Sequence, residues 1–103
     1  MSDAITIVTD DNFNAETSAG KVLVDFWGSW CSPCKKQSEI LDILASQRLG
    51  LKIVKANVDT NAEAVQKFGV RTLPTLLLLN NGEIAGLYTG LQNLSFLSSL
   101  AEG

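Results

Sequence analysis

Residues 21–27 (Lys-Val-Leu-Val-Asp-Phe-Trp) form an almost continuous apolar segment, and this segment constrains the fold of the chain most. Continuous rather than alternating apolar character is typical of a β-strand that is buried on both faces. Such a strand lies in a sheet that helices cover on both sides. Both cysteines of the chain follow it directly, and a stretch with helical spacing comes next. The segment therefore predicts an α/β fold.

Strand-like and helical segments alternate along the rest of the chain. Predicted strands cover residues 4–8, 21–27, 51–58, 75–79 and 83–89. Predicted helices run from a cap at Asp10 or Asp11 to about residue 17, from the cysteines to residue 48, from a cap at Thr60 or Asn61 to a stop at Gly69, and over residues 93–100. Asn80-Asn81-Gly82 predicts a tight hairpin turn between the last two strands. This order implies a mixed sheet with helices on both faces.

Composition limits the class of protein. A length of 103 residues suits a single domain, residues 1–103, with one core. Hydrophobic residues make up 46% of the chain and charged residues 18%, which indicates a compact globular protein rather than a disordered one. The net charge of −3 argues against nucleic acid as a partner, because phosphate binding needs clustered Lys and Arg.

The first residues and the longest apolar run indicate where in the cell the protein is expected. Met1-Ser2-Asp3-Ala4 lacks the basic region and apolar core of a secretory signal. The longest fully apolar run, Leu76 to Leu79, is far too short to span a membrane. We therefore expect a monomeric cytoplasmic protein with no membrane partner. In that compartment, two cysteines fit a working dithiol better than a structural disulfide.

The segment Trp30-Cys31-Ser32-Pro33-Cys34-Lys35 is the candidate active site. Two thiols at this spacing can close a small disulfide ring and so carry two electrons. Pro33 and the helical residues after it place the pair at the first turn of a helix, whose N-terminus favours a thiolate. Cys31 precedes the helix, so we expect it to be the more exposed, attacking thiol, while Cys34 resolves the mixed disulfide. The alternatives are half a zinc site or a chance pair of cysteines. Zinc needs four ligands and the chain has no His and no other Cys, so we expect no metal.

Several other polar and aromatic residues occupy positions that have two interpretations. Asp25 lies inside the apolar segment, where loss of hydration would raise its pKa; alternatively, it faces water at the strand end. Pro74 cannot donate a hydrogen bond inside a central strand, which suggests a special role; alternatively, it is simply the first residue of a strand. By pattern alone, Lys55 is a solvated strand lysine. Core residues are one interpretation of Trp27 and Trp30.

Five separated segments resemble the thioredoxin family, and together they span essentially the whole chain. They are Val24-Asp25-Phe26-Trp27, Trp30-Cys31 with Cys34-Lys35, Lys55 with Asp59, Arg71 through Leu73-Pro74-Thr75, and Asn81-Gly82 with Gly90. The resemblance implies the thioredoxin fold, a five-stranded mixed sheet in the order 1-3-2-4-5 with four helices on both faces. It also implies that the last two strands run antiparallel to the rest.

The resemblance also implies roles for residues of the site. Asp25 would be a buried acid that exchanges a proton with Cys34, and Lys55 would lie near Asp25 and tune its charge. A cis Leu73–Pro74 bond would leave the Leu73 backbone free to pair with an extended target segment. An apolar docking surface would comprise Trp30, Pro33, Leu73, Pro74 and Gly90. Trp27 would be a mostly buried structural residue, with its indole N–H bonded to Asp59.

The implied function is that of a general protein disulfide reductase. Its targets would be proteins that contain disulfides, and a thioredoxin reductase would reduce the Cys31–Cys34 disulfide again. NADPH would be the ultimate electron donor, while the chain itself binds no cofactor and has no nucleotide-binding glycine pattern. A non-catalytic binding subunit that uses the same apolar surface is one alternative. A disulfide oxidase or isomerase of an oxidising compartment is another.

The helix start departs from the pattern of the family. Ser32 replaces the usual Gly between Cys31 and Pro33, and we expect Ser32 and Pro33 to tune the reduction potential. Glu39 stands where the family usually has a helix-kinking Pro. Polar residues at positions 36–38, Lys-Gln-Ser, replace mostly apolar ones and make the start of the helix more polar. These departures are expected to affect the potential and the choice of partner rather than the reaction.

Overall fold

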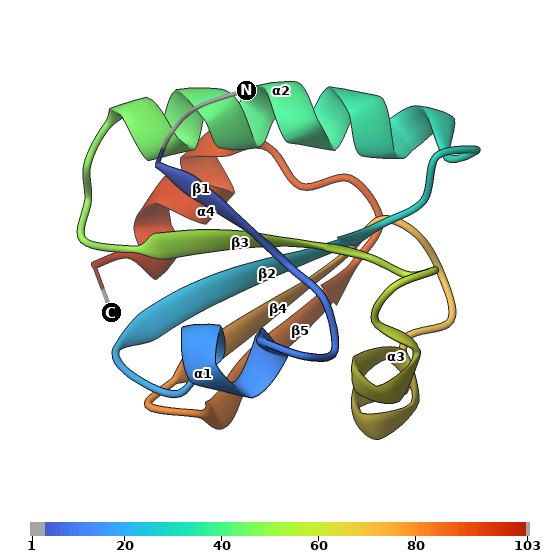
Figure 1. Ribbon diagram of the computed structural model, residues 1–103. Coiled ribbons are helices and arrows are strands. Elements are labelled where there is room, and N and C mark those ends of the chain that lie inside the picture. Colours follow the sequence, from blue (N-terminus) through green and yellow to red (C-terminus); the bar gives the residue numbers. More distant parts are fainter. Residues whose placement is uncertain (1–3, 103) are drawn as a thin grey trace.

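The computed structural model describes residues 4–102, in which a five-stranded sheet lies between two pairs of helices (Figure 1). The elements are β1 (Ile5–Val8), α1 (Phe13–Thr17), β2 (Lys21–Trp27), α2 (Ser32–Ser46), β3 (Lys52–Asn57), α3 (Ala62–Phe68), β4 (Thr75–Asn80), β5 (Glu83–Thr89) and α4 (Leu94–Leu100). The predicted element order is therefore confirmed. Residues 1–3, which contributed to the expectation that no secretory signal is present, lie outside the described range.

The strand order is β1-β3-β2-β4-β5, as the family resemblance implies. Strands β1 and β2 pair in parallel with β3, and β4 pairs antiparallel with β2. Strand β5 is antiparallel to β4, so it runs in the same direction as β1, β2 and β3. The expectation that the last two strands both oppose the rest is therefore wrong. The hairpin at Asn81 and Gly82, both with positive φ, reverses the chain a second time.

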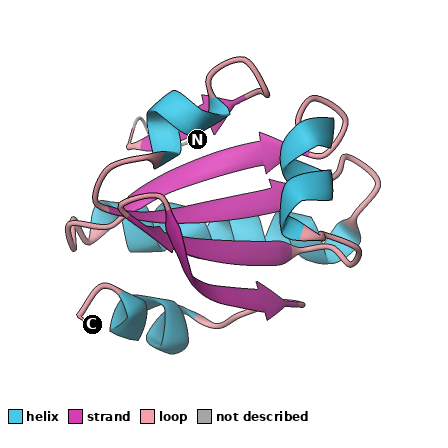
Figure 2. Ribbon diagram, turned by 90° about the horizontal axis from the view of Figure 1, so that it is seen from below, coloured by secondary structure: helices cyan, strands magenta, loops and turns pink. Residues whose placement is uncertain are grey.

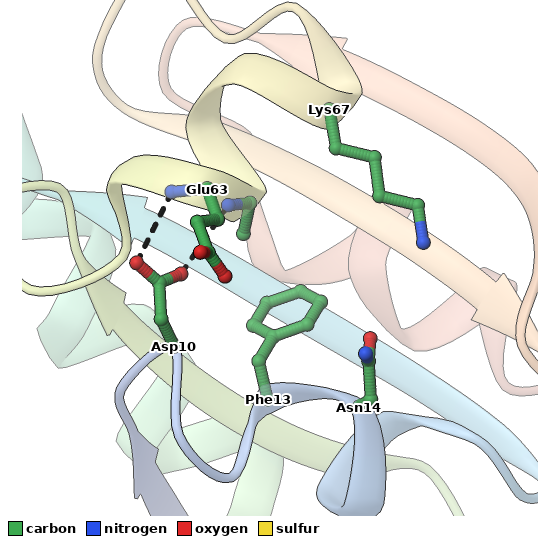
Figure 3. Close-up of a pocket in the computed structure, with 6 residues that line it drawn as sticks. Asp10, Phe13, Asn14, Glu63 and Lys67 are labelled. Atoms are coloured by element: carbon green, nitrogen blue, oxygen red, sulfur yellow. Dashed lines mark hydrogen bonds between the residues drawn. The ribbon is translucent and has the colours of Figure 1, made fainter.

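Helix α1 begins at Phe13, later than a cap at Asp10 or Asp11 predicts. The Asp10 carboxylate instead accepts hydrogen bonds from the first turn of α3, from the backbone N–H groups of Glu63 at 3.1 Å and Ala64 at 3.3 Å (Figure 3). Asp10 thus caps a helix that is distant in sequence. Helix α2 ends at Ser46 rather than at Arg48, because Arg48 adopts a positive φ of 51°.

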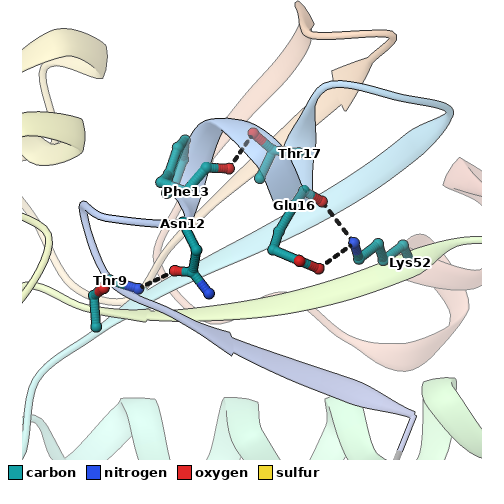
Figure 4. Close-up of polar contacts among 6 residues, drawn as sticks. All are labelled: Thr9, Asn12, Phe13, Glu16, Thr17 and Lys52. Atoms are coloured by element: carbon teal, nitrogen blue, oxygen red, sulfur yellow. Dashed lines mark hydrogen bonds and ion pairs between the residues drawn. The ribbon is translucent and has the colours of Figure 1, made fainter.

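Side-chain contacts anchor the short helix α1 (Figure 4). The Asn12 side chain accepts a hydrogen bond from the Thr9 N–H at 2.8 Å. The Lys52 ammonium on β3 donates to the carbonyl of Glu16 at 2.7 Å and to its carboxylate at 2.8 Å. A helix of five residues is too short to be stable alone, so these contacts with the sheet stabilise it.

The core has two layers, one on each face of the sheet (Figure 2). Alternate residues of β2 supply them: Val22, Val24 and Phe26 point toward α1 and α3, while Leu23 points toward α2 and α4. Asp25 has the same parity as Leu23, so its carboxyl group lies on the α2 face. The sheet thus directs the acid of its central strand toward the helix that carries the cysteines. No helix within residues 4–102 has the length and apolar character that crossing a membrane requires.

Candidate active site

The two cysteines form a disulfide at the N-terminus of α2, with their Cα atoms 5.3 Å apart. Cys31 caps the helix in an extended conformation, and Ser32 and Pro33 begin its first turn. The Cys34 N–H points at the Cys31 sulfur over 3.2 Å. A thiolate at Cys31 would accept this hydrogen bond at the positive end of the helix dipole, and both contacts favour the anion.

Both sulfur-bearing residues are largely buried in the disulfide form. Cys31 is 7% exposed and Cys34 is 3% exposed. This difference has the direction that the sequence predicts, but it is small because the ring packs both residues beneath the helix start. Ser32 and Pro33 beside them are exposed. The effect of Ser32 on the reduction potential stays a prediction.

Asp25 is completely buried on the face of the sheet beneath α2. Neither of its carboxylate oxygens has a hydrogen-bond partner among residues 4–102. Burial raises the pKa of Asp25 from 3.8 to about 7, and the positive charge of Lys55 partly opposes this shift. The predicted loss of hydration is therefore confirmed, and the alternative of a water-facing acid is wrong. An acid with this pKa can take up and release a proton near neutral pH.

Lys55 lies opposite Asp25 in the register of β3 and β2. Its ammonium group donates a hydrogen bond of 2.5 Å to the Ser38 hydroxyl on α2. The same group lies 5.2 Å from the centroid of the Trp27 ring, within the range of a cation–π contact. The half-buried lysine thus links the sheet to the helix, and the solvated strand lysine that the sequence pattern favours is wrong.

A cavity of about 130 Å³ lies beside the dithiol. Its lining residues are Trp27, Gly28, Ser29, Cys34, Lys35, Ser38 and Lys55. Its walls are largely apolar but include Ser38 and Lys55, and it is large enough to hold water. Asp25 is the next residue inward from Trp27 on the same face of β2. The cavity therefore brings solvent to Cys34 and to Lys55, the register partner of the buried acid.

The predicted contact between Trp27 and Asp59 is wrong. The Trp27 indole N–H is buried and has no hydrogen-bond partner within the described residues 4–102. Asp59 is exposed in the turn after β3, where its N–H donates to the Asn57 side chain at 2.9 Å. This turn holds Asp59 at the surface, so Trp27 contacts Lys55 instead.

Two residues of the expected docking surface, Trp30 and Pro33, adjoin the cysteines in sequence. The other three lie where β4 begins and β5 ends, with Leu73 and Pro74 before Thr75 and Gly90 after Thr89. Trp30 is 65% exposed, and the Leu73–Pro74 bond is cis, as the resemblance implies. The Gly90 N–H donates to the Pro74 carbonyl at 2.8 Å, so these two segments lie side by side. Leu73 is half-buried, and its backbone makes no hydrogen bond with the part of the chain that the structure describes. This N–H and C=O remain available to another chain.

Sequence reasoning missed a buried polar residue, Gln37. It was expected to make the helix start more polar, but it is completely buried. Its amide bonds the Gln92 backbone, with Gln37 Nε2 donating to the carbonyl at 3.1 Å and Gln37 Oε1 accepting from the N–H at 2.8 Å. Helical spacing offers the signal, because Cys34, Gln37, Leu41 and Leu44 share the buried face of α2.

A second pocket, of about 90 Å³, lies between α1 and α3 and contains none of the dithiol residues (Figure 3). Asp10, Phe13, Asn14, Glu63, Ala64 and Lys67 line it. Its central carboxylate, Asp10, already caps α3. In residues 4–102, no group of three or more His, Cys, Asp or Glu side chains is placed to hold a metal ion.

Comparison with known proteins gives the family. The thioredoxin family model matches residues 4–102. The chain belongs to the thioredoxin family. It is 46% identical to a thioredoxin of Bacillus subtilis over 99 residues, which cover 94% of each chain. It is 38% identical to a thioredoxin of Pseudomonas aeruginosa over 105 residues, covering 99% of this chain and 97% of the relative.

A solved structure gives the same result for the fold. A mutant thioredoxin from Halobacterium salinarum NRC-1 superposes with a TM-score of 0.87 at 33% identity, covering 95% of this chain and 88% of that one. The family and the Cys31–Cys34 disulfide together identify the chain as a protein disulfide reductase that works by dithiol–disulfide exchange.

Proposed function

We propose that Cys31 is the attacking thiol and that Cys34 resolves the mixed disulfide. The Cys31 thiolate attacks one sulfur of a target disulfide, so that a Cys31–target bond forms and the other target sulfur leaves as a thiolate. The Cys34 thiolate then attacks the Cys31 sulfur and releases the second target thiolate. Two electrons pass to the target, and the Cys31–Cys34 disulfide remains. The helix N-terminus and the Cys34 N–H support Cys31 as the anion in the first step.

Asp25 is the group that accepts the proton of Cys34 in the resolving step. Its raised pKa, about 7, lets it hold or release a proton at neutral pH, and it lies under the helix that bears Cys34. Lys55 tunes the charge of Asp25 through its position in the register. The cavity beside Cys34 supports transfer through water rather than by direct contact.

Target proteins dock around the dithiol as an extended segment. The unpaired Leu73 backbone offers an N–H donor and a C=O acceptor for β-ladder hydrogen bonds with the target. The exposed Trp30 and Pro33 offer apolar contacts beside the reacting sulfur. Pro74 and Gly90 complete this surface, which we name the docking rim: Trp30, Pro33, Leu73, Pro74 and Gly90. Recognition through the backbone suits a donor of electrons to many proteins, because it does not require a particular side chain.

The oxidised protein is returned to the dithiol by a thioredoxin reductase that draws its electrons from NADPH. We place this cycle in the cytoplasm, because a reducing compartment keeps a working dithiol reduced. We further propose that the protein acts as a monomer.

The single observation that carries the proposal is the Cys31–Cys34 disulfide at the start of α2. The test is an assay that couples NADPH oxidation, a thioredoxin reductase and reduction of insulin disulfides. We expect turnover by the wild type and none by Cys31→Ser. Cys34→Ser is expected to accumulate mixed disulfides through Cys31, which mass spectrometry of the trapped species identifies.

Two further measurements separate the alternatives. A binding subunit would keep its partner function in Cys31→Ser even though disulfide reduction is lost. An oxidase or isomerase would show a strongly oxidising reduction potential in glutathione redox buffers. Either result would contradict the proposed reductase.

A further inference from the structure

Gln37 is a polar residue in an otherwise apolar face of α2, and all of its hydrogen bonds go to one loop. It lies one helical turn beyond Cys34 and is completely buried. Its side-chain amide pairs with both backbone groups of Gln92, at 2.8 and 3.1 Å, in the way that two strands pair. Burying an amide costs free energy unless it is bonded, and here the two contacts compensate for this cost.

The loop that Gln37 holds is the loop that carries Gly90. The Gln92 side chain donates to the carbonyls of Thr89 at 3.2 Å and Gly90 at 3.3 Å. The Gly90 N–H in turn donates to the carbonyl of Pro74. A continuous set of hydrogen bonds therefore runs from the active-site helix to Gly90 and on to Pro74.

The two hydrogen bonds of Gln37 hold the loop in position and are not needed to fill space in the core. An apolar residue of similar volume at position 37 would fill the same space between α2 and the sheet, but it would leave the N–H and C=O of Gln92 unpaired. Gly90 has a positive φ of 84° and belongs to a short segment without regular structure between β5 and α4. Such a segment depends on contacts of this kind for a fixed position.

We propose that Gln37 is a positioning residue that fixes the Gly90 loop of the docking rim, and that it thereby favours polypeptide disulfides over small ones. The proposal rests on the proposed function, because it assigns a task to one part of the docking rim. A polypeptide segment contacts the rim over several residues, whereas a small disulfide needs only the sulfur of Cys31. Loosening the loop should therefore lower the rate constant for reaction with a protein disulfide but not with a small disulfide.

Amide hydrogen exchange tests the structural part. In the wild type, the Gln92 and Gly90 amides should be protected. In Gln37→Met, which has a similar volume but cannot form the two hydrogen bonds, both amides should exchange at least about tenfold faster. The Leu77 amide, in the core strand β4, should keep its protection. If the Gln92 amide of the wild type exchanges at the rate of an unprotected amide, the proposal is refuted, and this result needs no variant to fold. Gln37→Leu serves as a second variant.

Kinetics test the functional part with the chemically reduced protein in single-turnover reactions, so that no reductase intervenes. With insulin as the protein disulfide, the rate constant for Gln37→Met should fall about fivefold through weaker binding. With a small aromatic disulfide it should stay within about twofold, and the reduction potential should not change. The matched control is Gln47→Met, the same chemical change at the exposed C-cap of α2. It removes the hydrogen bond that Gln47 accepts from the Ser98 hydroxyl at 3.1 Å, at the end of the helix opposite the dithiol.

Equal losses with both disulfides would show that Gln37 acts on the dithiol itself and would overturn the proposal. Faster amide exchange without any loss toward insulin would overturn it as well. A wild type that reduces neither disulfide would refute the proposed function, and this is established before any variant is compared.

Discussion

Lys55 donates a hydrogen bond to Ser38, although its partner in the register of the sheet is the acid Asp25. The ammonium group is thus held by the helix above it, at 2.5 Å from the Ser38 hydroxyl, and both Asp25 oxygens are without a hydrogen bond within residues 4–102. Burial then dominates the ionisation of Asp25 and raises its pKa to about 7. We therefore expect Ser38, a residue of α2, to influence the charge of Asp25 on β2 through Lys55.

Replacing Ser38 tests this influence. In Ser38→Ala the ammonium of Lys55 loses its partner on the helix and can move toward the carboxylate, which favours the charged form. We expect the pKa of Asp25 to fall by roughly one unit. Titration of its carboxyl carbon by NMR measures the change. Lys55→Met is the matched control, in which removal of the positive charge should raise the pKa instead; a rise in both variants would contradict this explanation.

The buried acid also predicts how stability depends on pH. The Asp25 carboxyl group keeps its proton in the folded state up to a pH of about 7, whereas in the unfolded chain it loses it near 3.8. Folding therefore takes up a proton between these values, and the free energy of unfolding falls as the pH rises from about 4 to 7. Asp25→Asn removes this contribution of Asp25 to the pH dependence of the free energy of unfolding.

We expect Asp25→Asn to be more stable than the wild type by up to about 4 kcal/mol at pH 8, and to show a much smaller difference near pH 4. Urea unfolding of both proteins at several pH values gives the comparison, in which contributions of the other acids cancel. A difference that does not grow with pH would mean that Asp25 ionises normally in the folded state.

Gly28 determines where the Trp30 indole lies. A methyl group at Gly28 would come within 2.8 Å of two ring carbons of Trp30, closer than side chains approach one another. The ring is exposed and can move, so we expect Gly28→Ala to displace it toward solvent while costing less than about 1 kcal/mol in stability. In a Trp27→Phe background, Trp30 fluorescence should shift to longer wavelength. An unchanged emission spectrum would show that the ring does not rest on Gly28.

Asp10 gives a prediction that separates stability from function. Its carboxylate caps α3 at the backbone N–H groups of Glu63 and Ala64, away from the dithiol. Asp10→Ala should lower the free energy of unfolding by about 1 kcal/mol, the usual contribution of a helix cap. The rate of insulin reduction should stay as in the wild type. Urea unfolding and the coupled assay measure the two quantities, and a loss of activity in the folded variant would contradict a purely structural role.

Much of the fold follows from local patterns. The continuous apolar character of residues 21–27 predicts a strand buried on both faces, and β2 has these bounds. The turn at Asn81 and Gly82 is found where the Asn-Gly pair predicts it, because these residues tolerate positive φ. Asp25 is buried as its apolar neighbours indicate. In each case the signal lies within a few residues of the feature.

Other features depend on residues that are distant in sequence. Asp10 was expected to cap the helix that follows it, but it caps α3, more than fifty residues later. The direction of β5 was predicted incorrectly, because it depends on two successive antiparallel pairings and not on the strand itself. Trp27 was assigned to Asp59, but the turn after β3 holds Asp59 at the surface.

Spacing and local hydrophobicity in the sequence are enough to predict the dithiol, its place at a helix start, the apolar strand before it and the acid within that strand. The partners of the polar side chains, in contrast, follow from how the elements pack in three dimensions. Ser38 meets Lys55, and Gln37 meets Gln92, because α2 crosses the sheet and the loop after β5 at particular residues. A hydrogen bond needs its two atoms within about 3 Å, and the packing of whole elements sets such distances.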